Sequence, residues 1–307
     1  MGTIFMSTKK TIPYLHKLKS QNQPIVAITS YDYTFARMIE TAESDLDSGS
    51  CCDLVLVGDS LSGVMQGQKI ELYTSLDDII YHSRCVSRGL KTPLLVADLP
   101  FMTYQVSAKR ALLAAGRLIQ EGHAEAVKLE GGEEVTKQIN KIVTAGIPVI
   151  AHLGLTPQSF LKMGGYKVQG RSEKEAEKLK KDALAVQDAG ASIVVLEGIP
   201  ADLASEITSS LSIPTIGIGA GNGCDGQILV LHDLLGLNMS GHVAKFVKQF
   251  ANAKALCQDA ISQYAKEVRS REFPTPEHTY SALSNIKSTS SEVTKKEASK
   301  LLKAHGE

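Results

Sequence analysis

The sequence predicts an α/β protein of the (β/α)8 barrel class, a TIM barrel in which eight parallel strands alternate with helices. Short apolar runs recur along the chain, and most are followed by a longer stretch of helical period. Five of these runs end at or near a polar side chain, which is where the strands of such a barrel build their sites. A doubly wound sheet would show fewer strands or a clear second domain, so one barrel is the better interpretation.

The predicted strands and helices follow one another in order. The strands start near Pro24, Asp53, Pro93, Ala126, Ile147, Ser192, Ile213 and Gln227. Helix starts between them are indicated by Ser75 with Asp78 and by Ser172 with Glu175, which have the spacing of a capping box. Helix ends are indicated by Gly89, Gly122, Gly146 and Gly190. Only residues 220–226 separate the last two strands, so we expect an irregular last unit without a regular helix there.

The C-terminal part of the chain changes in character. Residues 242–271 have a helical apolar pattern that includes Phe246, Phe250 and Tyr264. Beyond Pro276 the chain is rich in Ser, Thr, Lys and Glu and has little apolar surface to bury. We therefore predict three parts: an N-terminal segment at 1–20, one catalytic barrel with a C-terminal helix at 21–275, and a mobile polar tail at 276–307.

Composition narrows the kinds of partner and the compartment. The chain has 307 residues with 33 basic and 33 acidic side chains, so nothing favours nucleic acid or an anionic membrane surface, and a small-molecule substrate fits better. No apolar run is long enough to span a membrane. Five cysteines without C-x-x-C spacing indicate reduced thiols, and hence a cytoplasmic protein. The lysine-rich, acid-free first 20 residues leave a mitochondrial presequence open, although they lack arginine.

Two aspartates end neighbouring predicted strands. Asp59 in DLVLVGDS and Asp98 in PLLVADLPF are a plausible pair of oxygen ligands for Mg²⁺, which commonly takes one or two carboxylates and leaves its other positions to water and substrate. A helix cap or an ion pair is the alternative for each aspartate.

The next two strands end in charged or titratable groups. Lys128 and Glu130 alternate in AVKLEGG and therefore face the same side of the sheet. Lys128 would hold a substrate carboxylate or an enolate oxygen, whereas a structural Lys–Glu pair at the barrel rim is an equally weighted alternative. His152, which ends IPVIAHLGL, fits a hydrogen-bond donor, a proton carrier or a buried core histidine.

Glu197 follows the most apolar predicted strand, SIVVL. We expect apolar surroundings to raise the pKa of its carboxyl group and to make it a base able to abstract a proton next to a carbonyl. An ion pair with an Arg or Lys is the alternative.

Two glycine-rich segments follow predicted strands five and seven. Gly217, Gly219 and Gly221 in IPTIGIGAG would let a ligand approach the backbone closely, but GIGAGNG is not a dinucleotide-binding fingerprint. The segment from HLGLTPQSF to GGYKVQGRS suits a lid or a shaped wall of a site.

Several phrases occur together in this order: VGDSL, ADLPF, VKLEGG, AHLGLTPQS, GGYKVQGR, VLEGIP and IGIGAGNGCDGQILVLHDLLG. Together they resemble the ketopantoate hydroxymethyltransferase family over residues 10–280. The resemblance implies a barrel of the phosphoenolpyruvate/pyruvate type in a homo-oligomer. It implies hydroxymethyl transfer from 5,10-methylenetetrahydrofolate to 3-methyl-2-oxobutanoate, through a Mg²⁺-stabilised enolate, to give 2-dehydropantoate in pantothenate synthesis.

The resemblance also implies a role for each candidate residue. The metal would be held by Asp59 and Asp98 with Glu130, and the proton at C3 of the substrate would be removed by Glu197. His152 would support the pocket. The substrate-binding residues would be Asp59, Ser60, Asp98 and Lys128. Tyr31 and Asp32 lie at the mouth of the first strand and receive no role.

The chain departs from the family pattern at three places. SDLDSGSCC is inserted before the second strand, which we expect to lie at the bottom of the barrel, away from the chemistry. LEGIP stands where the family often has LECVP, and the tail beyond Tyr280 is extra.

Two other functions stay open. A Mg²⁺-dependent 2-oxo acid lyase or aldolase of the same superfamily would share the enolate but not the folate, although VLEG in the sixth strand favours the transferase. A catalytically silent barrel with an assembly role is disfavoured by the intact acidic and basic residues.

Overall fold

The computed structural model describes residues 9–42, 49–239, 241 and 243–280. The chain divides into two compact units, Met1–Asn252 and Ala253–Glu307. In the first unit, eight parallel strands close into a barrel in sequence order, as predicted. The strands are β1 (Ile25–Thr29), β2 (Leu54–Val57), β3 (Leu94–Asp98), β4 (Ala126–Glu130), β5 (Val149–Gly154), β6 (Ile193–Glu197), β7 (Thr215–Ile218) and β8 (Gly226–Leu229).

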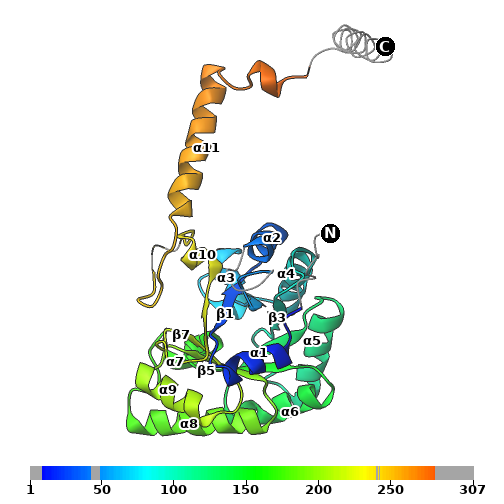
Figure 1. The fold of residues 1–307 in the computed structure, drawn as a ribbon, viewed down its shortest axis with the longest axis vertical. Helices are drawn as coiled ribbons and strands as arrows, with labels where there is room; N and C mark the ends of the chain where they lie inside the picture. The colour runs from blue at the N-terminus through cyan, green and yellow to red at the C-terminus, as the bar shows by residue number, and fades with distance from the viewer. Residues whose placement is uncertain (1–8, 43–48, 240, 242, 281–307) are drawn as a thin grey trace, which may run out of the picture. The chain divides into compact units, whose positions relative to one another are not determined.

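Helices of the first unit surround the strands, and α5, α6, α8 and α9 lie on the outside of the barrel (Figure 1). The α-helices of this unit are α1 (Ile12–Ser20), α2 (Tyr33–Thr41), α3 (Leu61–Val64), α4 (Leu76–Gly89), α5 (Ala108–Gln120), α6 (Thr136–Thr144), α7 (Phe160–Met163), α8 (Glu173–Asp188), α9 (Ala201–Ser210) and α10 (Leu231–Leu234). Three short 3₁₀ helices accompany them: η1 (Glu71–Tyr73), η2 (Glu133–Val135) and η3 (Pro157–Ser159). No helix separates β7 from β8, so the last unit is irregular as expected.

The alternation of side chains along each strand determines which residues fill the inside of the barrel. Leu54 and Leu56 of β2 and Ile193 and Val195 of β6 belong to one buried cluster inside the barrel, whereas the residues between them pack outward against the helices. Both faces of β2 to β5 are buried along almost their whole length, which explains why these strands read as nearly continuous apolar runs, whereas Val26 of β1 and Gln227 of β8 are exposed.

Both predicted capping boxes are present. Ser75 and Asp78 begin α4, and Ser172 and Glu175 begin α8; each serine hydroxyl accepts from the backbone N–H three residues later, and the acidic side chain returns to the serine N–H. These caps fix where two of the outer helices start.

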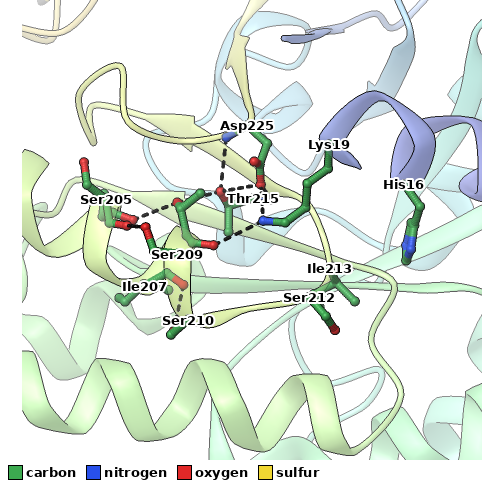
Figure 2. A network of polar contacts seen from close by, with 12 residues as sticks. His16, Lys19, Ser205, Ile207, Ser209, Ser210, Ser212, Ile213, Thr215 and Asp225 are labelled. Carbon is green, nitrogen blue, oxygen red and sulfur yellow. Dashed lines mark hydrogen bonds and ion pairs between the residues drawn. The ribbon is translucent and has the colours of Figure 1, made fainter. Parts of the chain in front are cut away.

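The bottom of the barrel is closed by α1. Leu15 and Leu18 of this helix are buried in the inner cluster. Lys19 contacts the Asp225 carboxylate at 2.8 Å and donates to the Thr208 carbonyl, and the backbone N–H of Thr215 donates to the same carboxylate, so α1, α9, β7 and the start of β8 are tied together (Figure 2). The barrel is thus packed shut at the end opposite the predicted site.

The described part of the predicted insertion also lies at the bottom. Lys10 donates to the carbonyls of Ser50 and Cys52 and lies 2.9 Å from the carboxylate of Asp53, which precedes β2. Residues 44–48 of SDLDSGSCC fall outside the described residues. All five cysteines have free thiols, as the sequence predicts.

The second unit contains α11 (Ala253–Ser270) and η4 (Pro276–His278). The helix predicted to begin at residue 242 begins instead at Ala253, and residue 242 itself lies outside the described residues. Phe246 and Phe250 belong to an irregular segment of the first unit because the Phe250 N–H donates to the Leu234 carbonyl rather than within a helix. Residues 281–307 of the predicted tail are outside the described residues. Where the chain is described, no helix is both long and apolar enough to cross a membrane.

Candidate active site

A cavity of about 190 Å³ opens at the carboxyl ends of the strands. Every candidate residue from the sequence lines it: Asp59, Ser60, Asp98, Lys128, Glu130, His152 and Glu197. A larger cavity of about 410 Å³ reaches Glu130 from the side of α8 but contains none of the other six. The smaller cavity is therefore the candidate active site.

Strand register brings the charged residues together. Asp98 is the partner of Lys128 across β3 and β4, and Glu130 is the partner of His152 across β4 and β5. Each of these four residues lies an even number of positions from a residue that faces the inside of the barrel, so its side chain faces inward as well. Asp59 lies beyond the end of β2, where its backbone N–H donates to Oδ2 of Asp98 at 2.9 Å. The two predicted aspartates are therefore neighbours.

Lys128 and Asp98 form a buried ion pair, with Nζ 2.9 Å from Oδ1. Burial lowers the pKa of Lys128, but the carboxylates of Asp98, Asp59 and Glu130 raise it more, so the ammonium group stays charged. Burial raises the pKa of Asp98, and Asp59 raises it further, against the opposite effect of Lys128. The two shifts thus have different causes: burial for the Asp98 carboxyl, and the surrounding carboxylates for the Lys128 ammonium.

His152 lies between two carboxylates. Its Nδ1 is 3.4 Å from Oε1 of Glu130, and its Nε2 is 3.1 Å from Oε2 of Glu197. Burial and Lys128 lower the pKa of His152, but its contacts with Glu130 and Glu197 raise it more, to about 9. The imidazole is therefore protonated at neutral pH. The partner of Glu197 is thus a histidine, not the Arg or Lys of the alternative interpretation.

Ser60 lies at the start of α3, where its hydroxyl is 2.8 Å from the hydroxyl of Tyr31. Burial raises the pKa of Tyr31, so this phenol stays neutral. Asp32, its neighbour, accepts from the Phe35 N–H and caps α2. Tyr31 thus positions a cavity residue, whereas Asp32 has a structural contact.

The segment after β5 forms a wall of the cavity, as the sequence suggests. The ring of Tyr166 packs against that of Phe160 at a tilt of 59°, with ring centroids 4.9 Å apart, and the Tyr166 hydroxyl donates to Oε2 of Glu71 at 2.6 Å. Burial raises the pKa of Glu71 to about 7, although the Tyr166 hydrogen bond opposes the shift. Glu71 and Tyr166 both line the cavity, so this contact joins the loops after β2 and β5 beside it.

The glycines in and after β7 pack closely against the protein's own side chains. Gly219 has φ +61°, and a Cβ there would lie 2.7 Å from the ring of Phe246. A Cβ at Gly221 would collide with Ala201, and one at Gly217 would press on Cys224. The close approach is therefore to the protein's own side chains, and Phe246 lines the cavity instead.

Sequence reasoning assigned no role to two buried residues, Gln158 and Tyr104. Gln158 lies in the short 3₁₀ helix η3, and Tyr104 lies in a turn-rich segment after β3. Their only sequence signal is their place in or beside the phrases AHLGLTPQS and ADLPF. In the structure, Gln158 contacts Asp59, Glu130 and Tyr104.

The cavity's donor set fits a magnesium ion. Carboxylates outnumber cationic groups in the cavity: Oδ1 of Asp98 lies 2.9 Å from the Lys128 ammonium and Oε1 of Glu130 lies 3.4 Å from His152, while Asp59 and Glu197 add further carboxylates. Nowhere in the described ranges do three His, Cys, Asp or Glu side chains converge as a complete metal cage. Mg²⁺ does not require one, because it often takes one or two carboxylates and completes its shell with water and substrate oxygens.

Comparisons with solved structures agree with the barrel. A phosphonopyruvate hydrolase in complex with oxalate and Mg²⁺ matches with a TM-score of 0.56 at 13% identity, covering 97% of this chain and 99% of that one. A 2,3-dimethylmalate lyase, described as a member of the PEP mutase/isocitrate lyase superfamily, matches with a TM-score of 0.55 at 15% identity, covering 96% and 99%. At such identities the likeness concerns the fold alone, which is the predicted (β/α)8 barrel.

Sequence comparisons find relatives of much higher identity. The 3-methyl-2-oxobutanoate hydroxymethyltransferase of Geobacter sulfurreducens is 50% identical over 90% of this chain and all of its own length. The enzyme of the same name from Clostridium beijerinckii is 48% identical, over 89% of this chain and 96% of its own. The family model described as ketopantoate hydroxymethyltransferase matches residues 9–276. The chain therefore belongs to the ketopantoate hydroxymethyltransferase family.

Proposed function

We propose that the protein catalyses the reaction of 3-methyl-2-oxobutanoate, 5,10-methylenetetrahydrofolate and water to give 2-dehydropantoate and tetrahydrofolate. The observation that carries this proposal is the placement of Glu197 and His152 beside Lys128 and the aspartates in one small cavity. The names of the relatives support the choice of substrates.

Lys128 and Ser60 provide the groups that hold the oxo acid. The buried ammonium of Lys128 offers a charge to the substrate's carboxylate or oxo oxygen, and the Ser60 hydroxyl offers a hydrogen bond. These contacts turn C3 of the substrate toward Glu197. Apolar neighbours in the cavity, such as Val195 and Ile218, suit the two methyl groups.

Glu197 acts as the base in this proposal. Its carboxylate takes the proton from C3, the electron pair of the broken C–H bond forms the C2=C3 bond, and the oxo oxygen takes the negative charge. Protonated His152 holds Glu197 in place through the 3.1 Å contact. Over the whole reaction the one-carbon unit forms one bond to C3 and one to the oxygen of water, while both of its bonds to the folate nitrogens break. The proton from C3 and one proton of water end on those two nitrogens, and the other proton of water stays on the new hydroxyl group.

Asp59 and Asp98, with Glu130 beside them, would hold a divalent cation. When bound, Mg²⁺ would supply positive charge next to the substrate's oxygens and so favour loss of the C3 proton. The backbone N–H of Asp59 donates to Oδ2 of Asp98, so the two aspartates stay side by side at this place.

The folate carrier is placed outside the cavity. A volume of about 190 Å³ suits a small oxo acid, whereas pockets for larger ligands occupy roughly 300–1,000 Å³. We place the carrier at the opening beside Tyr166, Glu71 and Phe246, with only its one-carbon unit reaching C3.

Free thiols on all five cysteines suit a reducing, cytoplasmic location. A homo-oligomer is proposed from the family resemblance.

Proton exchange at C3 tests the proposal. Exchange of 3-methyl-2-oxobutanoate with deuterated water is followed by NMR, first with Mg²⁺ and then with EDTA, before methylenetetrahydrofolate is added. Metal-dependent exchange followed by ketopantoate formation is expected. Exchange without transfer would favour the 2-oxo acid lyase, and folded protein with neither reaction would favour the silent barrel.

A further inference from the structure

Gln158, in η3, lies at the centre of a buried hydrogen-bond network next to the cavity. Only 6% of the residue is exposed. Its Nε2 donates to Oδ2 of Asp59 at 2.8 Å and to the Leu99 carbonyl at 3.0 Å, and its backbone N–H donates to Oε2 of Glu130 at 2.9 Å. Gln158, in the segment after β5, therefore binds one oxygen of the Asp59 carboxylate, which follows β2, and one oxygen of the Glu130 carboxylate, which ends β4.

The partners of the Gln158 amide allow one orientation. Asp59 Oδ2 and the Leu99 carbonyl are both acceptors, so the NH₂ group must face them. The amide oxygen then faces donors, the hydroxyl of Tyr104 at 2.8 Å and the side-chain amide of Gln105 at 3.1 Å. The Tyr104 hydroxyl also accepts from the Glu130 backbone N–H at 3.1 Å. Its one proton has two acceptors, the Gln158 amide oxygen and the Glu130 carbonyl at 3.0 Å, so Tyr104 links the amide to the backbone of Glu130 while Asp59 and Leu99 fix the orientation of the amide.

We propose that Gln158 is a positioning residue that sets the places of the Asp59 and Glu130 carboxylates and thereby the protein's affinity for a divalent cation. This inference rests on the proposed function only in assigning those carboxylates to a metal. By holding Oδ2 of Asp59 and Oε2 of Glu130, Gln158 leaves the second oxygen of each carboxylate to turn toward the cavity. It also brings donors to a site where carboxylates outnumber cationic groups.

Chain topology supports a role beyond local packing. Asp59 and Glu130 lie 71 positions apart, and Gln158 is separated from them by 99 and 28 positions, so neither local backbone geometry nor one strand can fix their spacing. Asp59 needs such support because it lies beyond the last paired residue of β2. Gln158 supplies the link across the top of the barrel.

Manganese affinity tests the proposal without recourse to activity. Gln158→Met keeps the length and apolar body of the side chain but removes its donors and acceptor. We expect it to weaken Mn²⁺ binding, measured by EPR of the free ion, by about 10–100-fold. Tyr104→Phe, which removes the hydroxyl that contacts the amide oxygen, should weaken it in the same direction by a smaller factor.

Gln138 supplies the matched control. It is also buried, at 9% exposure, and its amide donates to the Tyr104 carbonyl at 3.4 Å, with no hydrogen bond to a carboxylate among the described residues. Gln138→Met should leave Mn²⁺ affinity within about twofold of the unchanged protein, below the effect expected at Gln158. Thermal unfolding of each variant establishes that it is folded.

Two outcomes distinguish this inference from the proposed function. If the unchanged protein binds Mn²⁺ and folded Gln158→Met and Tyr104→Phe bind it equally tightly, the positioning role is overturned while the function stands. If the unchanged protein binds no divalent cation, both the positioning role and the metal part of the proposed function are overturned. Recovery of C3 exchange in Gln158→Met at saturating Mn²⁺ would support an effect through the carboxylates rather than on folding.

Discussion

Nε2 of His152 lies 3.1 Å from Oε2 of Glu197, and the pKa of this histidine is raised to about 9. A protonated imidazole on β5 therefore faces the proposed base on β6. The contact orients one carboxylate oxygen and leaves the other for a substrate proton. Since burial alone would lower the pKa of His152, the surrounding carboxylates must hold its charge.

Glu197→Gln should abolish proton abstraction while preserving the shape of the cavity. We expect C3 exchange to fall by about 10²–10⁴-fold, because an amide cannot accept the proton. Binding of the oxo acid, measured by calorimetry, should change little. Glu206→Gln, on the exposed side of α9, is the control and should exchange normally; unchanged exchange in Glu197→Gln would remove Glu197 from the role of base.

Lys128→Met should destabilise the fold and weaken oxo acid binding together. Removing one partner of a buried ion pair typically costs about 3–5 kcal/mol, because the remaining charge is left uncompensated. The free energy of unfolding in urea measures this loss. Asp98→Asn in the same chain should restore part of the stability but not the binding, and a Lys128→Met protein as stable as the original would contradict the pairing.

Glu71 should make stability depend on pH. Its pKa rises from about 4.5 in the unfolded chain to about 7 in the fold, so the folded state binds the proton more tightly. Stability therefore falls as pH rises from 4.5 to 7, and the loss is complete above 7. Glu71→Gln should be more stable than the unchanged protein by about 1–3 kcal/mol at pH 8 but equally stable at pH 4.

Tyr166→Phe provides the control for this pH effect. The Tyr166 hydroxyl stabilises the charged form of Glu71, so its loss should raise the pKa of Glu71 further and enlarge the penalty at pH 8. Urea unfolding of all three proteins at both pH values measures the differences. A gain from Glu71→Gln that is the same at pH 4 and pH 8 would rule out titration of this group as the cause.

Leu15→Ala should affect stability without affecting the chemistry. Leu15 is fully buried at the bottom of the barrel, where truncation of a leucine costs about 2–5 kcal/mol. KM for the oxo acid should stay the same, since the cavity lies at the opposite end. Leu113→Ala, on the exposed face of α5, should leave unfolding unchanged. A raised KM in folded Leu15→Ala would show that the two ends are coupled.

The strand-end residues were predictable because period-two alternation decides which side chains face inward. Lys128 and Glu130 share a face for this reason, and parallel pairing then brings them to Asp98 and His152. Their contacts were not predictable, because the sequence gives no strand register. His152 as the partner of Glu197 emerges only from the three-dimensional arrangement.

The residues in the loops were harder to predict. Gln158 and Tyr104 carry no periodic signal, since their roles depend on hydrogen bonds between segments far apart in sequence. The helical spacing of its neighbours predicts a helix at Phe246, but in the structure its ring lies against Gly219. Local pattern cannot reveal such a contact when the partner is a glycine backbone.

The packing of α1 against the lower end of the barrel has a consequence for the order of events in turnover. With Leu15 and Leu18 filling that end, the cavity of the described barrel is reached from the opening above the strands. With the folate at the place proposed for it, the small oxo acid would enter before the folate covers that opening, and ketopantoate would depart after tetrahydrofolate has left. Steady-state kinetics should accordingly be sequential and ordered, with excess folate slowing the reaction by occupying the entrance of the empty enzyme.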